Sequence, residues 1–267
     1  MNDEDPLLGR ARRLWEALAA APVSFAPSGG VSVVVSPESG LCPPSWVGVV
    51  MLGNAAIVTA PTEAAARAWK RGTAGAPVES LVSAEAVRGM VHMTDALGPA
   101  TLAYASPEDF RPWTAGAVGP AGAVVEEVRA GSEELRALVG SVGREDADES
   151  GIQEITSPAF VVRGEGGGGN GGAGADGASG GNGGAAVIAA AGYRTWPEST
   201  AHISVLTAPG HRGRGLARRT ASAAVARALE AGLMPQWRAR TVESRAVARA
   251  LGFRELGMQL SVRLDEF

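Results

Sequence analysis

Short apolar runs alternate with amphipathic stretches along the chain, separated by glycine, proline and polar residues. In residues 5–22, apolar side chains recur every three or four positions, which predicts a helix with one buried face. Apolar runs of strand length follow in the first 118 residues at 31–37, 46–52, 55–61 and 100–106. Two further helices are predicted at 62–72, with Thr62 as N-cap, and at 83–91. We therefore expect an α/β unit in this part of the chain.

A second series of elements follows a small, flexible stretch at 114–123. The predicted strands lie at 123–130, 159–164, 185–196, 202–209, 234–240 and 259–267. The predicted helices lie at 131–142, with Ser132 as N-cap, 216–233 and 241–252. The order is β-α-β-β-β-α-β-α-β, and it predicts a mixed sheet because loops join antiparallel strands while helical crossovers join parallel ones. We expect two domains, 1–120 and 121–267.

A glycine tract interrupts the second series at residues 164–184, between two predicted strands. Such a segment cannot bury enough apolar surface to offset the entropy of ordering it. We expect a disordered hairpin loop that can be shortened with little effect on stability or activity. A phosphate-binding loop would carry a few placed glycines and not a tract.

Composition narrows the class of protein. No apolar run approaches the ~20 residues that span a bilayer, and the acidic N-terminus, MNDEDPLLGR, lacks a signal pattern. We expect a soluble, cytoplasmic protein with no membrane partner. The single cysteine, Cys42, rules out an intramolecular disulfide, and with three histidines we expect no metal site. The net charge is −4, although ten arginines and two acids lie between His211 and Arg254.

The segment PGHRGRGLARRT, residues 209–220, joins a predicted strand to a predicted helix. Gly213 and Gly215 let the backbone approach a ligand closely, and the first N–H groups of the helix favour an anion. Arg212, Arg214 and His211 add positive charge or hydrogen-bond donors. The segment is neither a P-loop, since it has no lysine, nor a dinucleotide fingerprint, since Arg218 replaces the third glycine. We expect a pyrophosphate site.

The sequence from 204 to 233 resembles motif A of the GNAT superfamily, the acyl-CoA-dependent N-acyltransferases. Its [QR]xxGx[GA] pattern is matched by Arg212, Gly215 and Ala217. The sequence TVESRAVARALGF, residues 241–253, resembles motif B of the same family at the expected spacing. The resemblance covers about residues 122–267. It implies a GNAT fold in the second domain. The first domain carries no motif of the family, although its strand count allows a degenerate copy of the same fold.

The resemblance also implies where acetyl-CoA binds. Two neighbouring parallel strands would splay apart and hold it, with the pyrophosphate on the backbone of the turn. The pantetheine arm would pair with the strand edge, and a backbone N–H near Leu206 would polarise the acetyl carbonyl. The cofactor-binding residues implied in this way are Val205, Leu206, Thr207, His211, Arg212, Gly213, Arg214, Gly215, Leu216 and Ala217.

The chain departs from the family at the acid that protonates the leaving thiolate. The usual motif B tyrosine is replaced by Ala248, and the usual asparagine by Thr241. Ser244, one turn earlier, offers a hydroxyl to the sulfur. For the base we nominate His202, which shares a strand face with Ser204 and Leu206 and has a suitable ordinary pKa. Glu198 is the second candidate.

We therefore expect an N-acetyltransferase that transfers an acetyl group from acetyl-CoA to a primary amine by direct attack. The acceptor would be a small molecule or a peptide, drawn toward acids at Asp146, Asp148 and Glu149. The alternative is a coenzyme A-binding module of weak activity, which the missing tyrosine favours. Nucleic-acid binding through the arginines is not expected, because the chain is acidic overall and aromatic residues are sparse there. A homodimer is left open.

Overall fold

The computed structural model describes residues 5–114, 124–164 and 185–265, and the chain divides into two compact units. Unit 1 comprises Met1–Arg111, Trp196–His202 and Ala231–Phe267, and unit 2 comprises Pro112–Thr195 and Ile203–Glu230. These units differ from the contiguous domains 1–120 and 121–267 predicted from sequence. The C-terminal segment joins unit 1 because β10 (Arg254–Leu264) hydrogen-bonds to both β2 (Val47–Leu52) and β4 (Met93–Tyr104).

The sheet of unit 1 is mixed. Its strand order is β1-β3-β2-β10-β4-β9, followed by the first residues of β8. The remaining bounds are β1 Gly30–Val35, β3 Ala55–Ala60, β9 Met234–Ala239 and β8 Thr200–Thr207. β1 runs parallel to β3, and β9 runs parallel to β8 in the register Thr200↔Met234 to His202↔Gln236. The other pairs in this unit are antiparallel.

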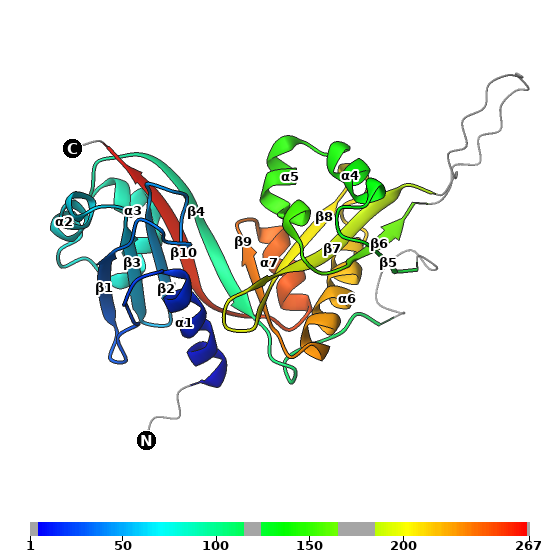
Figure 1. Cartoon of the computed structure of the whole chain (residues 1–267), viewed down its shortest axis with the longest axis horizontal. Helices are drawn as coiled ribbons and strands as arrows, with labels where there is room; N and C mark the ends of the chain where they lie inside the picture. The colour runs from blue at the N-terminus through cyan, green and yellow to red at the C-terminus, as the bar shows by residue number, and fades with distance from the viewer. Residues whose placement is uncertain (1–4, 115–123, 165–184, 266–267) are drawn as a thin grey trace, which may run out of the picture. The chain divides into compact units, whose positions relative to one another are not determined.

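Helices cover both faces of the unit 1 sheet (Figure 1). On one face, α1 (Pro6–Leu18) buries Leu14 and Trp15 against β2, β3 and β4. On the other face, α2 (Glu63–Gly72), the 3₁₀ helix η1 (Val78–Val82) and α3 (Ala84–Arg88) pack on Val49, Val58 and Leu260. The helix α7 (Val242–Ala250) contacts β9, and Phe253 just after it meets Trp237 of that strand edge-on.

In unit 2 the strand order runs from the last part of β8 to β7 (Val187–Trp196), then to β6 (Ala159–Arg163), and ends at β5 (Glu126–Val128). The face that carries Val161 and Leu206 packs against α4 (Glu133–Gly140) and against Ile152 of η2 (Ile152–Glu154). The opposite face packs against Leu216 of α6 (Leu216–Glu230). The short helix α5 (Arg144–Ser150) follows α4 (Figure 1).

The predicted fold class, α/β with a mixed sheet, is confirmed. Thr62 and Ser132 are N-caps as predicted, since their hydroxyl groups accept from the backbone N–H of Ala65 and Leu135. Two details differ. The strand predicted at 100–106 begins earlier, at Met93, and the acidic segment at 144–150 forms a helix of its own. The glycine tract falls almost entirely at 165–184, outside the described residues.

Candidate active site

The predicted phosphate loop joins β8 to α6 within unit 2. β8 ends at Thr207, one 3₁₀ turn covers Pro209–His211, and α6 begins at Leu216. Gly213 and Gly215 both have φ of +75°, a left-handed conformation that other residues adopt only at a cost. An added Cβ at Gly213 would meet no atom within 4 Å, so the loop surface there is open. The two glycines therefore serve the backbone conformation and expose the main chain.

Arg212 anchors this loop to its surroundings in unit 2. Its Nε donates to the carbonyl oxygen of Thr207 at 3.3 Å, and its Nη2 donates to Oδ2 of Asp146 in α5 at 2.7 Å. Asp148 pairs with Arg144 at 3.6 Å. Two of the three acids expected to attract an amine are thus engaged with arginines, which lowers their pull on a distant cation.

The N-terminus of α6 supplies the donors that an anion needs. α6 has 15 residues, and the N–H groups of its first turn have no partner within the helix. Nearby, His211 Nδ1 and Thr207 Oγ1 are buried with no hydrogen-bond partner among the described residues. His211 also lines a cavity of about 630 Å³, together with residues of α4 and β7. Polar atoms buried without partners are uncommon and are often satisfied by a ligand or water.

The histidine nominated as base, His202, lies in unit 1 and is half-buried. Its Nδ1 lies 2.5 Å from Oε1 of Gln236, its cross-strand partner on β9. Because an amide oxygen can only accept, Nδ1 carries the hydrogen and Nε2 carries the lone pair that takes up a proton. The imidazole also stacks on Trp196, with centroids 4.1 Å apart and an angle of 6°. Both contacts fix the plane of the ring.

A buried tyrosine continues this arrangement. Tyr104 is the cross-strand partner of Gln236 on the other side of β9, so β4, β9 and β8 align three polar side chains. The hydroxyl oxygen of Tyr104 accepts from Trp15 Nε1 at 2.6 Å, and Trp15 meets Trp196 edge-on at 6.1 Å. Burial raises the pKa of Tyr104, so it stays protonated at neutral pH. We call Trp15, Tyr104, Trp196, His202 and Gln236 the histidine network.

The other two catalytic candidates also lie in unit 1. Glu198 is exposed in the turn between β7 and β8, with φ of +53°, and its carbonyl accepts from Thr200 Oγ1 at 3.3 Å. Ser244 lies in the first turn of α7, and its hydroxyl oxygen accepts from Trp237 Nε1 at 2.9 Å. Ala248, where the family has tyrosine, is 2% exposed. The cofactor-binding candidates from Val205 to Ala217 belong to unit 2.

Sequence reasoning named His202 but missed the four other members of the histidine network. Gln236 offered one signal, a polar residue between the apolar residues Met234, Pro235 and Trp237 of the predicted strand 234–240. The structure shows it to be completely buried.

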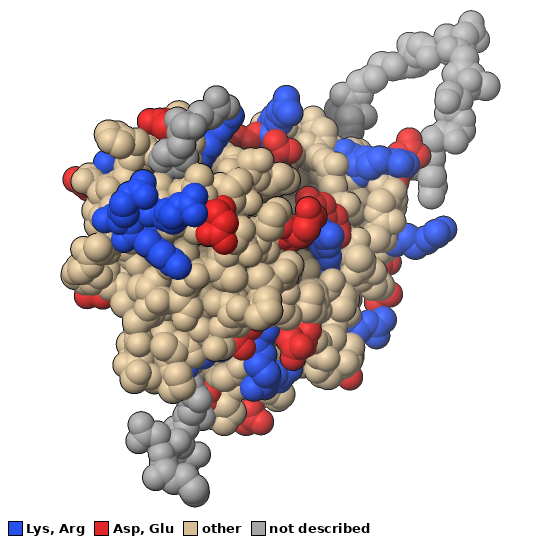
Figure 2. Space-filling view, turned by 60° about the vertical axis from the view of Figure 1, so that its left-hand side comes forward, with Lys and Arg blue, Asp and Glu red and all other residues tan. Residues whose placement is uncertain are grey.

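Many C-terminal arginines have acidic partners. Arg227 pairs with Glu127, and Arg245 and Arg249 both pair with Glu255. In the face shown in Figure 2, basic and acidic side chains are interspersed, apart from one larger basic group. Within the described residues, no helix is long and apolar enough to cross a membrane. In the same part of the chain, no three His, Cys, Asp or Glu residues are placed to hold a metal ion.

Comparison with known proteins finds one family-model match in the C-terminal part. Residues 181–257 match the family model described as GNAT acetyltransferase. No curated protein matches significantly.

Solved structures of low identity also match. A putative GNAT acetyltransferase from Novosphingobium aromaticivorans has 19% identity and a TM-score of 0.42, over 66% of this chain and 68% of its own. A GCN5-related N-acetyltransferase from Kribbella flavida has 17% identity and a TM-score of 0.45, over 69% and 64%. A tandem GNAT protein from the clavulanic acid biosynthesis pathway has 14% identity and a TM-score of 0.40, over 69% and 59%.

Proposed function

We propose that the protein is an N-acetyltransferase that transfers an acetyl group from acetyl-CoA to a primary amine by direct attack. The observation that carries the proposal is the β8–α6 loop, in which two left-handed glycines lead into the N-terminus of α6. The match of residues 181–257 to a GNAT acetyltransferase family model supports it.

In this proposal the pyrophosphate of acetyl-CoA accepts from backbone N–H groups at 212–217, where the positive end of α6 stabilises its charge. Two further groups can form hydrogen bonds with the cofactor. These are His211 Nδ1 and Thr207 Oγ1, which are buried without hydrogen-bond partners in the described structure. The pantetheine arm runs along Val205–Thr207. Arg212 holds the loop in place through its bonds to Thr207 and Asp146.

The chemical step needs a neutral amine. His202 Nε2 takes one proton from the ammonium group, and the amine nitrogen then attacks the acetyl carbonyl carbon. The C–N bond forms, the C–S bond breaks, and coenzyme A leaves as a thiolate. The tetrahedral intermediate loses a second proton to water, and the thiolate gains one from water. Gln236 keeps Nδ1 protonated, so that Nε2 is the basic nitrogen throughout.

A coenzyme A-binding module without transfer is the second candidate. It is favoured by the alanine at 248 and by the engagement of the Ser244 hydroxyl oxygen with Trp237, which leave no evident acid for the thiolate. Thermal shift with acetyl-CoA, followed by thiol release over a panel of amines, separates the two. Stabilisation with release supports the enzyme, and stabilisation without release supports the module.

Gly215→Val tests the cofactor site directly. A branched side chain at φ of +75° would strain the loop and cover the backbone N–H groups, so acetyl-CoA binding should be lost. Gly232→Val is the matched control, because Gly232 has φ of +73° and open space around it, beyond the C-terminal end of α6. Equal acetyl-CoA affinity in the two variants would contradict the proposal.

A further inference from the structure

One edge of the unit 1 sheet is open. β1 is the outermost strand of the described sheet and pairs there with β3 alone (Figure 1). Its six residues, GVSVVV, include neither a charged residue nor a proline. Edge strands usually carry such residues or are very short, because an unpaired edge otherwise attracts another strand. The outermost strand of unit 2 has both protections, since β5 has three residues and two of them are Glu126 and Glu127.

The hydrogen bonds of β1 to β3 identify the backbone groups that face outward. Gly30 N–H donates to the carbonyl oxygen of Asn54 at 3.2 Å, and Ser36 N–H donates to that of Ala60 at 2.8 Å. In a parallel pair, alternate residues direct both their N–H and their C=O toward the same neighbour, so the even-numbered residues of β1 face β3. The residues whose backbone groups point to the open side are therefore Val31, Val33 and Val35.

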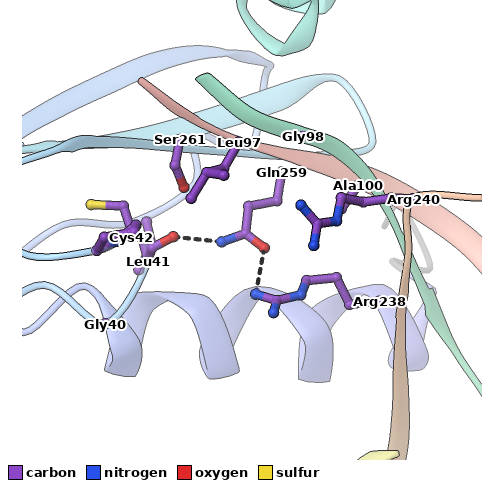
Figure 3. Close-up of a pocket in the computed structure, with 11 residues that line it drawn as sticks. Gly40, Leu41, Cys42, Leu97, Gly98, Ala100, Arg238, Arg240, Gln259 and Ser261 are labelled. Carbon is purple, nitrogen blue, oxygen red and sulfur yellow. Dashed lines mark hydrogen bonds between the residues drawn. The ribbon is translucent and has the colours of Figure 1, made fainter. Parts of the chain in front are cut away.

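The chain on both sides of β1 turns onto the sheet face that carries α1 and leaves the edge uncovered. Before β1, Phe25 packs in the core with α1, and its N–H donates to Glu16 of that helix at 2.9 Å. After β1, the loop 40–43 lines a pocket of about 300 Å³, where Gln259 Nε2 donates to the carbonyl oxygen of Leu41 (Figure 3). Leu41 belongs to the same core as α1. Among the described residues, neither flank gives β1 a backbone hydrogen bond on its open side.

The outward-facing residues also form an apolar stripe on the opposite sheet face, where α2 lies. Val31, Val33 and Val35 share this face by alternation. Val33 and Val35 are only partly buried against the core under α2, and Val31 is 39% exposed. α2 contacts both β1 and β3, so it lies close to the edge. A strand added at this edge would cover the stripe and the outward backbone groups together.

We propose that β1 pairs with β1 of a second copy of the chain in antiparallel orientation, which joins two unit 1 sheets into one. A two-fold axis normal to the sheet places Val33 opposite its own copy, and Val31 opposite Val35 of the partner subunit. These pairs are of the hydrogen-bonded kind, in which two residues exchange both N–H···O=C bonds. Because both copies use the same edge, the assembly closes at a dimer and leaves no open β1 edge.

The charges of α2 favour a second copy of this chain over an unrelated strand. Glu63 lies in the first turn of α2, and Lys70 and Arg71 lie in its last turn. Under the two-fold axis the two α2 helices lie on the same face and run in opposite directions, so the acidic end of each lies beside the basic end of the other. All three side chains are exposed. The pair of Glu63 with Arg67, 3.8 Å apart, is also exposed and therefore weak enough to rearrange.

The first experiment measures the mass of the full chain by sedimentation equilibrium across the micromolar range, where we expect the parent to be a dimer. Val31→Lys adds a charge of the kind that protects natural edges, and it should weaken dimerisation at least about 10-fold. Val242→Lys is the matched control, because Val242 is a 72% exposed valine of α7, away from β1, and this variant should dimerise as the parent does. Equal dimerisation in Val31→Lys would overturn the proposal. A monomeric parent would also overturn it and leave the edge to a strand of a different protein.

The second experiment tests the register by oxidation with oxidised glutathione. Hydrogen-bonded partners in an antiparallel pair have Cα atoms about 5.5 Å apart, a separation that a disulfide spans. Val33→Cys should therefore form a covalent dimer. Val34→Cys is the control, because its copy is a diagonal neighbour roughly 7–8 Å away, and the parent controls for Cys42. Failure of Val33→Cys to cross-link, or equal cross-linking of the two variants, would overturn the two-fold pairing.

The third experiment exchanges the charges of α2. Lys70→Glu combined with Arg71→Glu places acidic residues at both ends of the helix, which should weaken dimerisation about 10-fold at low salt. Adding Glu63→Lys reverses the polarity of the helix and should restore the affinity of the parent. Weakening without this restoration would overturn the pairing of the two α2 helices.

Discussion

His202 and Gln236 face each other across the parallel strands β8 and β9, with Nδ1 and Oε1 2.5 Å apart. This contact decides which imidazole nitrogen can act as a base. The amide is buried and the imidazole is half-buried, so one side of the pair is protected from water and the other is accessible. Removing either partner therefore has a distinct expected effect.

His202→Ala removes the base. We expect turnover to fall by roughly 10²–10⁴, the usual contribution of a general base, with acetyl-CoA affinity nearly unchanged. The measurement is the steady-state rate across pH together with calorimetry for acetyl-CoA. His92→Ala, an exposed histidine in unit 1, is the matched control. Parent-like turnover at every pH would remove His202 from the mechanism and leave Glu198 or water as the base.

Gln236→Leu keeps the volume but removes the acceptor for Nδ1. The imidazole can then adopt either tautomer, so we expect kcat to fall about 10-fold with little change in the KM for acetyl-CoA. Gln236→Glu restores an acceptor, and its negative charge favours the imidazolium. In that variant activity should return, and the acidic limb of the pH–rate profile, on which the rate rises as His202 loses its proton, should move to higher pH. An unshifted limb in active Gln236→Glu would mean that His202 does not supply the titrating group.

Tyr104→Phe removes the hydroxyl that Trp15 Nε1 donates to in the core of unit 1. A buried N–H left without a partner costs about 1–3 kcal/mol, and we expect the free energy of unfolding to fall by that amount. The double variant with Trp15→Phe should be less destabilised than the sum of the single variants, because neither partner is then left unpaired. Urea denaturation of the four proteins measures this coupling, and strict additivity would contradict it.

Glu255 makes stability depend on pH at the acidic end. Hydrogen bonds from Arg245 and then Arg249 lower its pKa from the ordinary 4.5 to about 2. Because the pKa of Glu255 is lower in the folded state than in the unfolded state, its ionised carboxylate stabilises the fold. This contribution is fully present above pH 4.5 and is lost as the pH falls through about 2. Glu255→Gln should therefore cost about 1–2 kcal/mol at pH 7.

The difference between the parent and Glu255→Gln should shrink between pH 4.5 and 2, as followed by chemical denaturation at each pH. The exposed pair Glu63–Arg67, 3.8 Å apart, provides the control variant Glu63→Gln, for which we expect little change. A constant difference down to pH 2 would contradict the assignment.

Local signals in the sequence predicted the elements and the β8–α6 loop well. Thr62, Ser132, Gly213 and Gly215 act within a few residues of their own position, so caps and left-handed turns can be read from neighbouring residues. The extension of β4 to Met93 was missed because Gly98 and Pro99 interrupt the strand pattern there. The sheet accommodates them through register shifts against β10.

The histidine network could not be predicted, because it depends on register between strands that are distant in sequence. Tyr104 and Gln236 meet only because β4 pairs with β9, and nothing local to either residue specifies that pairing. The same applies to Gln259, whose Nε2 donates to the carbonyl oxygen of Leu41, a residue far away in the sequence. The sequence of each strand records which residues are buried, but not which strand lies beside it.

The central position of β10 has a consequence for how the protein is made. β10 begins at Arg254, yet it pairs with β4, which ends at Tyr104, and with β2 before that. During synthesis at roughly 5–20 residues per second, β10 is made on the order of ten seconds after β2 and β4, the two strands between which it pairs. Until then both leave unpaired edges of the kind that recruit other chains. High contact order of this type slows folding, so expression yield should be more sensitive to chaperone supply than the small size of each unit suggests.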